Sequence, residues 1–246
     1  MNNIHKIQSH NVANRSESAP KYGALLGLLI AFTPLLIIGV VGEWLGDGTA
    51  PGAILINIGY AVSILIATVV LKQRDSGWRK IGLGRPPSWL KTMLLAIGTA
   101  VIYIVVANIV LPVFLQLLPL PAFEQADQSN YASLYHNFRL LLLYVAAAWT
   151  IIPFGEEMLF RAFLMDSLSL FFQDSKARWA LTLIGSAILF GLAHFSWGLP
   201  GVIQTTVLGL VLGSIFLKTG RNLWVTVIAH GILNTLVFIL IYSGVI

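Results

Sequence analysis

The chain has 246 residues, of which 57% are hydrophobic and only 10% are charged. Soluble domains are typically about 25% charged, so a soluble fold is excluded because its exterior could not be covered with polar groups. The formal net charge is +5. The chain has no cysteine, which excludes disulfides and thiolate metal sites. Composition therefore predicts a protein that uses lipid as its solvent.

The first segment, residues 1–21, is polar. It contains no apolar h-region, and no A-x-A site follows the first apolar run, so it does not have the pattern of a cleavable signal peptide. We expect a disordered cytoplasmic tail there. Residues 22–246 are expected to form a single membrane domain.

Seven apolar runs follow the tail, and most approach the ~20 residues that a helix needs to span the hydrocarbon. They predict an all-α, polytopic transmembrane bundle of about seven spans, with six to eight possible. Only Gly198–Pro200 separates the fifth and sixth runs, which predicts a tight hairpin or a re-entrant pair. The runs are residues 22–45, 52–71, 92–118, 140–165, 179–197, 199–217 and 223–245.

Small residues four apart, Gly23/Gly27 and Gly209/Gly213, favour close packing of their helices. Chance matches to this spacing are common in apolar sequence, so two alternatives are weighed equally: these glycines lie at helix–helix interfaces, or they do not.

The basic residues lie on one side of the predicted membrane. With the N-terminus inside, segments 1–21, 72–91, 166–178 and 218–222 hold 13 of the 15 Lys and Arg residues. This bias predicts a cytoplasmic N-terminus. It also explains the positive charge through contact with the bilayer, so we expect no nucleic-acid partner. Trp78 and Trp89 are expected to anchor the basic loop 73–91 at the interface.

Ionisable side chains inside a span are costly, so each is a functional hypothesis. The fourth run contains Glu156, Glu157 and Arg161. In an α-helix Glu157 and Arg161 share a face, whereas Glu156 points about 140° away from Arg161. This predicts a structural carboxylate at Glu157 and a free one at Glu156. The alternative is that both acids pair with Arg161 or reach an interface.

Three further polar side chains fall in other spans: His194, His230 and Asn234. Singly, each is better explained by packing or by a polar contact between helices. Together with Glu156 they suit hydrolysis, with Glu156 as general base, His194 on the water, and His230 with Asn234 as oxyanion donors. The competing version is a divalent metal, such as zinc, held by Glu156, His194 and His230. Asn is a poor zinc ligand, and the sequence has no H-E-x-x-H motif.

These motifs, in this order, resemble the CPBP family of intramembrane proteases. The family comprises type II CAAX prenyl endopeptidases and their bacterial relatives, also called the ABI family. The likeness covers residues 139–245 and includes Leu223-Trp224, whereas the N-terminal half offers only a faint Leu83-Gly84-x-x-Pro87 element. The resemblance implies a base at Glu156, a water-binding His194, an oxyanion site of His230 and Asn234, and supporting roles for Glu157 and Arg161.

The resemblance further implies an endopeptidase acting on a peptide or protein substrate at or in the membrane. Its mechanism would be glutamate-type, without a tightly held metal, or that of a metalloprotease. Bacterial relatives are linked to bacteriocin processing and self-immunity, and a bacterial cell membrane is the expected location. Two other classes stay open: a proton-coupled transporter whose Glu and His relay protons, and a non-catalytic scaffold or immunity protein.

The charge bias makes a topology prediction. Reporter fusions in loop 73–90 are expected to give cytoplasmic signals, and fusions in 120–138 external ones, because basic loops remain inside. The opposite pattern, or one side for both loops, would refute the proposed arrangement.

Overall fold

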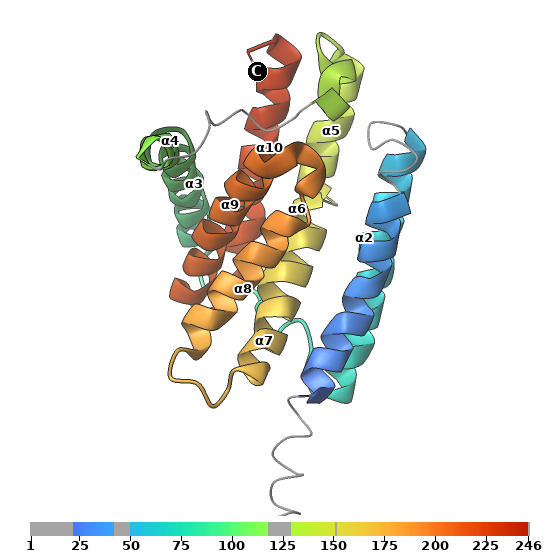
Figure 1. Cartoon of the computed structure of the whole chain (residues 1–246), viewed down its shortest axis with the longest axis vertical. Helices are drawn as coiled ribbons and strands as arrows, with labels where there is room; N and C mark the ends of the chain where they lie inside the picture. Colours follow the sequence, from blue (N-terminus) through green and yellow to red (C-terminus); the bar gives the residue numbers. More distant parts are fainter. Residues whose placement is uncertain (1–21, 42–49, 118–128, 151, 246) are drawn as a thin grey trace, which may run out of the picture.

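The computed structural model describes residues 22–41, 50–117, 129–150 and 152–245, and within these ranges every regular element is a helix (Figure 1). Six of the described helices are long and apolar enough to cross a membrane. The predicted all-α, polytopic class is confirmed. The predicted tail, residues 1–21, lies outside the described ranges, and the single membrane domain over 22–246 stays a prediction.

Three helices precede the family-like region. α3 begins at Trp89 because the Ser88 side chain accepts a hydrogen bond from the backbone N–H of Lys91 at 3.3 Å, which caps the helix three residues before the predicted start. The helices are Tyr22–Val41, α2 (Ala50–Gln73), and a third helix formed by α3 (Trp89–Val105), the π-helix η1 (Val106–Val110) and α4 (Leu111–Gln116).

The fourth candidate span, Phe138–Phe171, is 34 residues long and follows the short 3₁₀ helix η2 (Ser129–Leu134). At ~1.5 Å per residue it measures ~50 Å, well beyond the ~30 Å of hydrocarbon. It ends six residues after the predicted boundary at 165, because Asp166 stays helical while pairing with Arg221 at 3.3 Å. Its parts are α5 (Phe138–Thr150), α6 (Ile152–Glu156), the π-helix η3 (Glu157–Leu164) and α7 (Met165–Phe171).

The predicted fifth and sixth spans form a hairpin of unequal arms. α8 (Arg178–Leu192) has 15 residues, or ~22 Å, which is too short to cross the hydrocarbon. The 3₁₀ turn η4 (Phe195–Trp197) and Gly198, at φ 72°, reverse the chain into α9 (Gly198–Lys218). The hairpin prediction is confirmed, and it reduces the seven predicted spans to six with one short helix.

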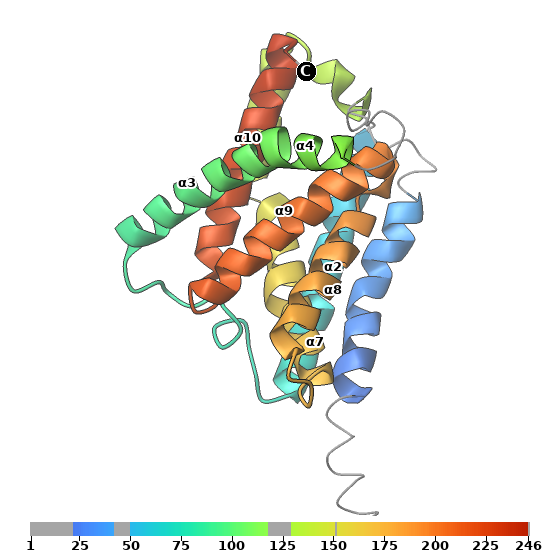
Figure 2. The ribbon, with the colours of Figure 1, turned by 60° about the vertical axis from the view of Figure 1, so that its left-hand side comes forward.

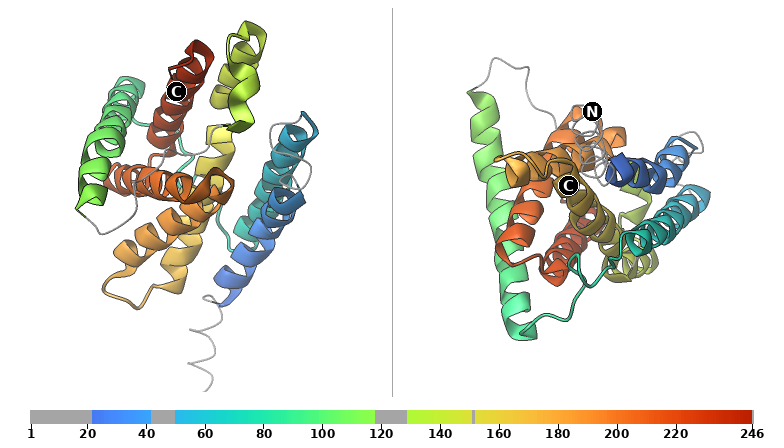
Figure 3. Two further views of the ribbon diagram at one scale, coloured as in Figure 1. Left: turned by 45° about the horizontal axis from the view of Figure 1, so that its top comes forward. Right: turned by 90° about the horizontal axis from the view of Figure 1, so that it is seen from below.

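The last helix, α10 (Leu223–Ser243), is the most enclosed of the candidate spans. Of its most apolar 18-residue stretch 56% is buried, against at most 39% for the other five. It packs against α3, α5, α9 and η3, as Figures 2 and 3 show. The buried polar side chains of α10, Thr226 and His230, are therefore surrounded by protein rather than by lipid.

Small residues let α8 and α9 approach closely. A Cβ atom on Gly209 would lie 2.9 Å from the Cα atom of Ala187, and one on Gly213 would overlap Leu183. The Gly209/Gly213 prediction is confirmed. In the other pair Gly27 lies against Val70, whereas Gly23 has no neighbour within 4 Å of such an atom.

The described basic loops meet at one end of the bundle, at the lower end in Figure 1. Three arginines from three segments contact the end of the long helix, which explains how a 34-residue helix is fixed there. The contacts are Arg74 Nη1 to Ser167 Oγ at 3.0 Å, Arg178 Nη2 to Ser169 Oγ at 3.1 Å, and Arg221 Nη1 to Asp166 Oδ1 at 3.3 Å.

The hairpin contact predicts a sharp difference between two glycines. Gly209→Ala is expected to lower the unfolding free energy by about 1–3 kcal/mol, because the new methyl group meets backbone. Gly98→Ala on the exposed face of α3, where nothing lies within 4 Å, is the control and should leave it unchanged or raise it by up to about 1 kcal/mol, because alanine favours the helix. Denaturant unfolding in micelles measures both, and equal effects would contradict the close contact.

Candidate active site

The two acidic residues of the long helix stand where its α-helix becomes a π-helix. Glu156 ends α6 and Glu157 begins η3. Both are buried, with exposed fractions of 5% and 0%. A π-helix places residues five apart, rather than four apart, above one another. The α-helical spacing that separated Glu156 from Arg161 in the prediction therefore does not hold from Glu157 onward.

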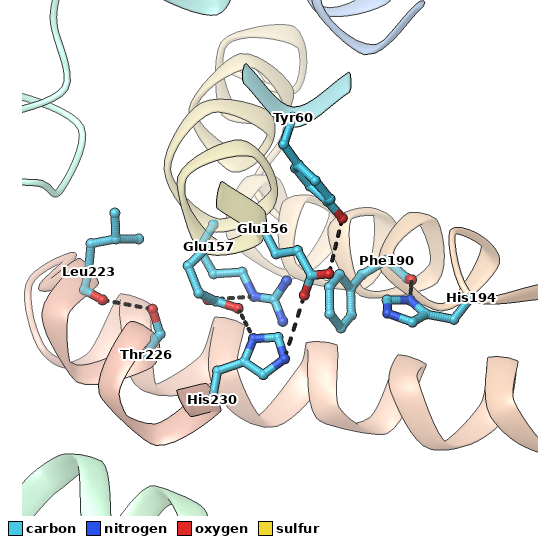
Figure 4. A network of polar contacts seen from close by, with 9 residues as sticks. Tyr60, Glu156, Glu157, Phe190, His194, Leu223, Thr226 and His230 are labelled. Atoms are coloured by element: carbon cyan, nitrogen blue, oxygen red, sulfur yellow. Dashed lines mark hydrogen bonds and ion pairs between the residues drawn. The ribbon is translucent and has the colours of Figure 1, made fainter. Parts of the chain in front are cut away.

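His230 of α10 lies between these two carboxylates (Figure 4). Its Nδ1 atom is 3.0 Å from Oε1 of Glu157, and its Nε2 atom is 3.5 Å from Oε2 of Glu156. The imidazole is itself buried. A single ring thus joins the long helix to α10 through both of its nitrogen atoms.

Arg161 supplies the positive charge of the cluster. Its Nε atom lies 3.2 Å from Oε2 of Glu157, which confirms the predicted i,i+4 pair. Its guanidinium lies 4.1 Å over the ring of Phe190, a cation–π contact that stabilises a buried cation. The guanidinium is 1% exposed, and within the described ranges its two terminal nitrogens have no hydrogen-bond acceptor.

The division of labour between the two acids is therefore only partly as predicted. Glu157 forms the ion pair with Arg161, as expected. Glu156 does not contact Arg161 directly, but it shares His230 with Glu157. The two carboxylates belong to one network rather than to separate environments.

His194 lies two residues after the end of α8, at the apex of the hairpin. Its Nδ1 atom is 2.8 Å from the carbonyl oxygen of Phe190, so Nδ1–H donates there and Nε2 is left as an acceptor. The Phe190 ring packs against both histidines, with centroids 4.8 Å from His194 and 6.0 Å from His230. The structure thus brings His194 to the cluster across this ring.

Asn234 lies one helical turn beyond His230 on the same face of α10, as its spacing predicts. Its side chain is half-buried. Among the described residues it has no hydrogen-bond partner, whereas its neighbour Thr235 accepts a hydrogen bond from Trp149 at 3.0 Å. The amide is therefore available to a bound molecule.

One residue of the network was missed by the sequence analysis. Tyr60 of α2 donates a hydrogen bond from its hydroxyl group to Oε1 of Glu156 at 3.0 Å. The only sequence signal for it is indirect: Gly155, beside Glu156, has no side chain, and a Cβ atom there would lie 3.3 Å from the Tyr60 ring. No motif in the N-terminal half indicates the tyrosine.

The competing metal set, Glu156, His194 and His230, does not form a recognisable metal centre. Across the described ranges no three His, Cys, Asp or Glu side chains are placed to share one ion. Nδ1 of His194 is bonded to a carbonyl group and Nδ1 of His230 faces Glu157, contacts that metal-bound histidines also make through their second nitrogen. The side chains of the described residues are nevertheless not gathered around one ion, and the chemistry is derived from the protein groups alone.

Comparison with known proteins gives a family for this part of the chain. The model of the type II CAAX prenyl endopeptidase Rce1-like family matches residues 138–236, a range that contains all six predicted site residues. No curated protein and no solved structure matches the chain. Together with the six candidate membrane-spanning helices, this match supports a multi-pass membrane protein whose residues 138–236 are similar to a CAAX-type protease. Residues 138–236 thus match the Rce1-like type II CAAX prenyl endopeptidase family, in agreement with the resemblance that the motifs suggested.

Proposed function

We propose that this protein is an intramembrane endopeptidase in which Glu156 is the general base and His230 and Asn234 stabilise the oxyanion. The observation that carries the proposal is the placement of His230 between two buried carboxylates. Burying two acids inside apolar helices is costly, and a structural role needs only the Glu157–Arg161 pair. A catalytic role accounts for the burial of the second carboxylate, Glu156.

The reaction begins with a water molecule between Glu156 and His194. Glu156 takes one proton from the water, while the free Nε2 atom of His194 accepts a hydrogen bond from the other. The resulting hydroxide attacks the peptide carbonyl carbon. The C–N bond then breaks as Glu156 returns its proton to the leaving nitrogen, which completes the hydrolysis.

Negative charge develops on the carbonyl oxygen during the attack. An imidazole that carries both protons can donate Nδ1–H to Glu157 and Nε2–H toward the site. The unengaged amide of Asn234, one turn away, supplies a second donor. Glu157 and Arg161 act through His230: the first holds the ring, and the second balances the charge of the first.

The burial of the site narrows the class of substrate. The reacting groups lie inside the helical bundle, so the scissile peptide must enter at bilayer depth. This favours a peptide attached to, or inserted in, the membrane. Processing of a bacteriocin-like peptide and cleavage of a prenylated C-terminus both satisfy this requirement.

The two acids predict opposite phenotypes. Glu156→Gln is expected to reduce cleavage about 100-fold or more, with little change in stability, because the amide keeps the shape but cannot accept the proton. Glu157→Gln is expected to lower the unfolding free energy by about 3 kcal/mol, because it leaves Arg161 buried without its partner. Release of the C-terminal tripeptide from a prenylated CAAX-type peptide, followed by mass spectrometry, measures activity, and denaturant unfolding measures stability.

The control is wild-type protein in the same micelles, with and without a chelator of divalent metals. The proposal expects cleavage in both conditions, whereas chelator-sensitive cleavage restored by zinc would favour the metal version. The proposal fails if Glu156→Gln cleaves as well as the wild type.

Tyr60 is proposed as a positioning residue for Glu156. Its hydroxyl group binds one carboxylate oxygen, which leaves the other to face His230 and the water. Tyr60 and Glu156 come from different helices, and α2, which carries Tyr60, lies outside the range that matches the family model. The hydrogen bond therefore fixes the orientation of the base from outside the family segment.

Tyr60→Phe is expected to lower kcat about 10- to 100-fold at unchanged KM, the size expected for one hydrogen bond to a charged group. Tyr103→Phe is the matched control, because the Tyr103 hydroxyl bonds the carbonyl group of Gln204 at 3.5 Å rather than a side chain of the cluster. Equal losses in the two variants, or a loss confined to KM, would contradict a positioning role.

A further inference from the structure

A hollow lies at the basic end of the bundle, apart from the site described above. It has a volume of about 230 Å³ and forms between the loop that precedes α3 and the turn that joins α9 to α10. The faint Leu83-Gly84-x-x-Pro87 element contributes part of this loop. The residues around the hollow are Arg79, Lys80, Gly82, Gly84, Arg85, Pro86, Pro87, Thr219, Gly220, Arg221 and Asn222.

The charge of this hollow is of one sign. Four of its residues are cations, namely Arg79, Lys80, Arg85 and Arg221, and none is acidic. Arg221 is engaged by Asp166, but Arg79 and Arg85 have no hydrogen bond or ion pair with any described residue and are exposed. Two arginines without an acceptor among the described residues thus line one space, and guanidinium is the group that best matches phosphate oxygens.

The two segments around the hollow are held together by hydrogen bonds to two backbone carbonyl groups. The N–H of Leu223 donates to the carbonyl group of Gly82 at 3.1 Å, and Nε1 of Trp224 donates to that of Gly84 at 3.1 Å. Gly82 has φ 133°, and a Cβ atom on it would lie 2.7 Å from the carbonyl oxygen of Arg221. A larger residue is excluded there, so the hollow is built by the fold rather than by flexible side chains.

Helix ends add to the positive potential. α3 and α10 both begin beside the hollow, after their capping residues Ser88 and Asn222. The N-termini of helices attract anions. α9 ends there as well, but its last carbonyl groups are already bonded by the N–H groups of Thr219, Gly220 and Arg221.

The depth of the hollow indicates the source of the anion. Trp89, the first residue of α3, is 46% exposed and packs edge-on against Trp224 with ring centroids 5.5 Å apart. Leu90, the next residue, is 72% exposed and belongs to the lipid-facing surface. Tryptophan gathers at the level of lipid headgroups, so the hollow opens where phosphates of the bilayer lie.

From these observations we propose that the hollow around Arg79 and Arg85 binds a phosphate group, supplied by an anionic phospholipid. The site is independent of peptide hydrolysis, because it shares no residue with the cluster around His230. Binding there would hold the loop before α3 against the start of α10, the helix that carries His230 and Asn234.

The test uses the purified full-length chain in a neutral detergent. Short-chain phosphatidylglycerol, short-chain phosphatidylcholine, inorganic phosphate and hexaglutamate are titrated separately, and Tm is measured. Phosphatidylglycerol at about a hundred times its Kd is expected to raise Tm by about 5 °C or more, with little effect of phosphatidylcholine. The double variant Arg79→Gln/Arg85→Gln is expected to lose this rise while keeping the Tm of the lipid-free protein.

The matched control is Lys72→Gln/Lys176→Gln, which removes the same charge from exposed basic residues outside the hollow. It is expected to keep the full rise in Tm. A rise produced by inorganic phosphate and lost only in the arginine variant supports the phosphate site and makes its source soluble phosphate. The proposal is overturned by equal losses in the two double variants, by a rise with hexaglutamate alone, or by no rise with any of the four.

Discussion

The constraint on which the rest of the structure depends is the burial of the Glu157–Arg161 ion pair among apolar helices. In hydrocarbon an unpaired charge costs several kcal/mol, so neither residue can be buried without the other. The pair in turn fixes what surrounds it. Phe190 of α8 covers the guanidinium, and His230 of α10 binds the carboxylate, so two further helices are positioned by one ion pair.

The proposed catalysis uses a second carboxylate, Glu156, that this structural ion pair does not need. Glu156 and Glu157 are adjacent where the π-helix begins, and His230 contacts both carboxylates through its two ring nitrogens. Glu157 is paired with Arg161 and contacts His230, whereas Glu156 keeps an oxygen that faces the site. Such pairs of like groups in unlike surroundings are how proteins assign acid and base roles.

Much of this arrangement could be predicted from sequence because it depends on local periodicity. Apolar runs located the spans, and the i,i+4 spacing found the partner of Arg161. The π-helix could not be foreseen, because an extra residue in a turn is stabilised by tertiary contacts and leaves no pattern. Tyr60 escaped for a similar reason: a tyrosine in an apolar helix is unremarkable until Glu156 is placed beside it. Asp166 was taken as a boundary because the arginine that neutralises it is 55 residues away.

The short arm of the hairpin has a consequence for the membrane itself. Lipids beside α8 meet ~22 Å of apolar helix where their chains need ~30 Å, and a bilayer accommodates such a mismatch by thinning. His194 lies two residues beyond the end of that helix, so a thinner bilayer brings headgroups and their hydration toward its imidazole. The acyl-chain length of the surrounding lipids is thereby expected to change the hydration around His194 without any bound ligand.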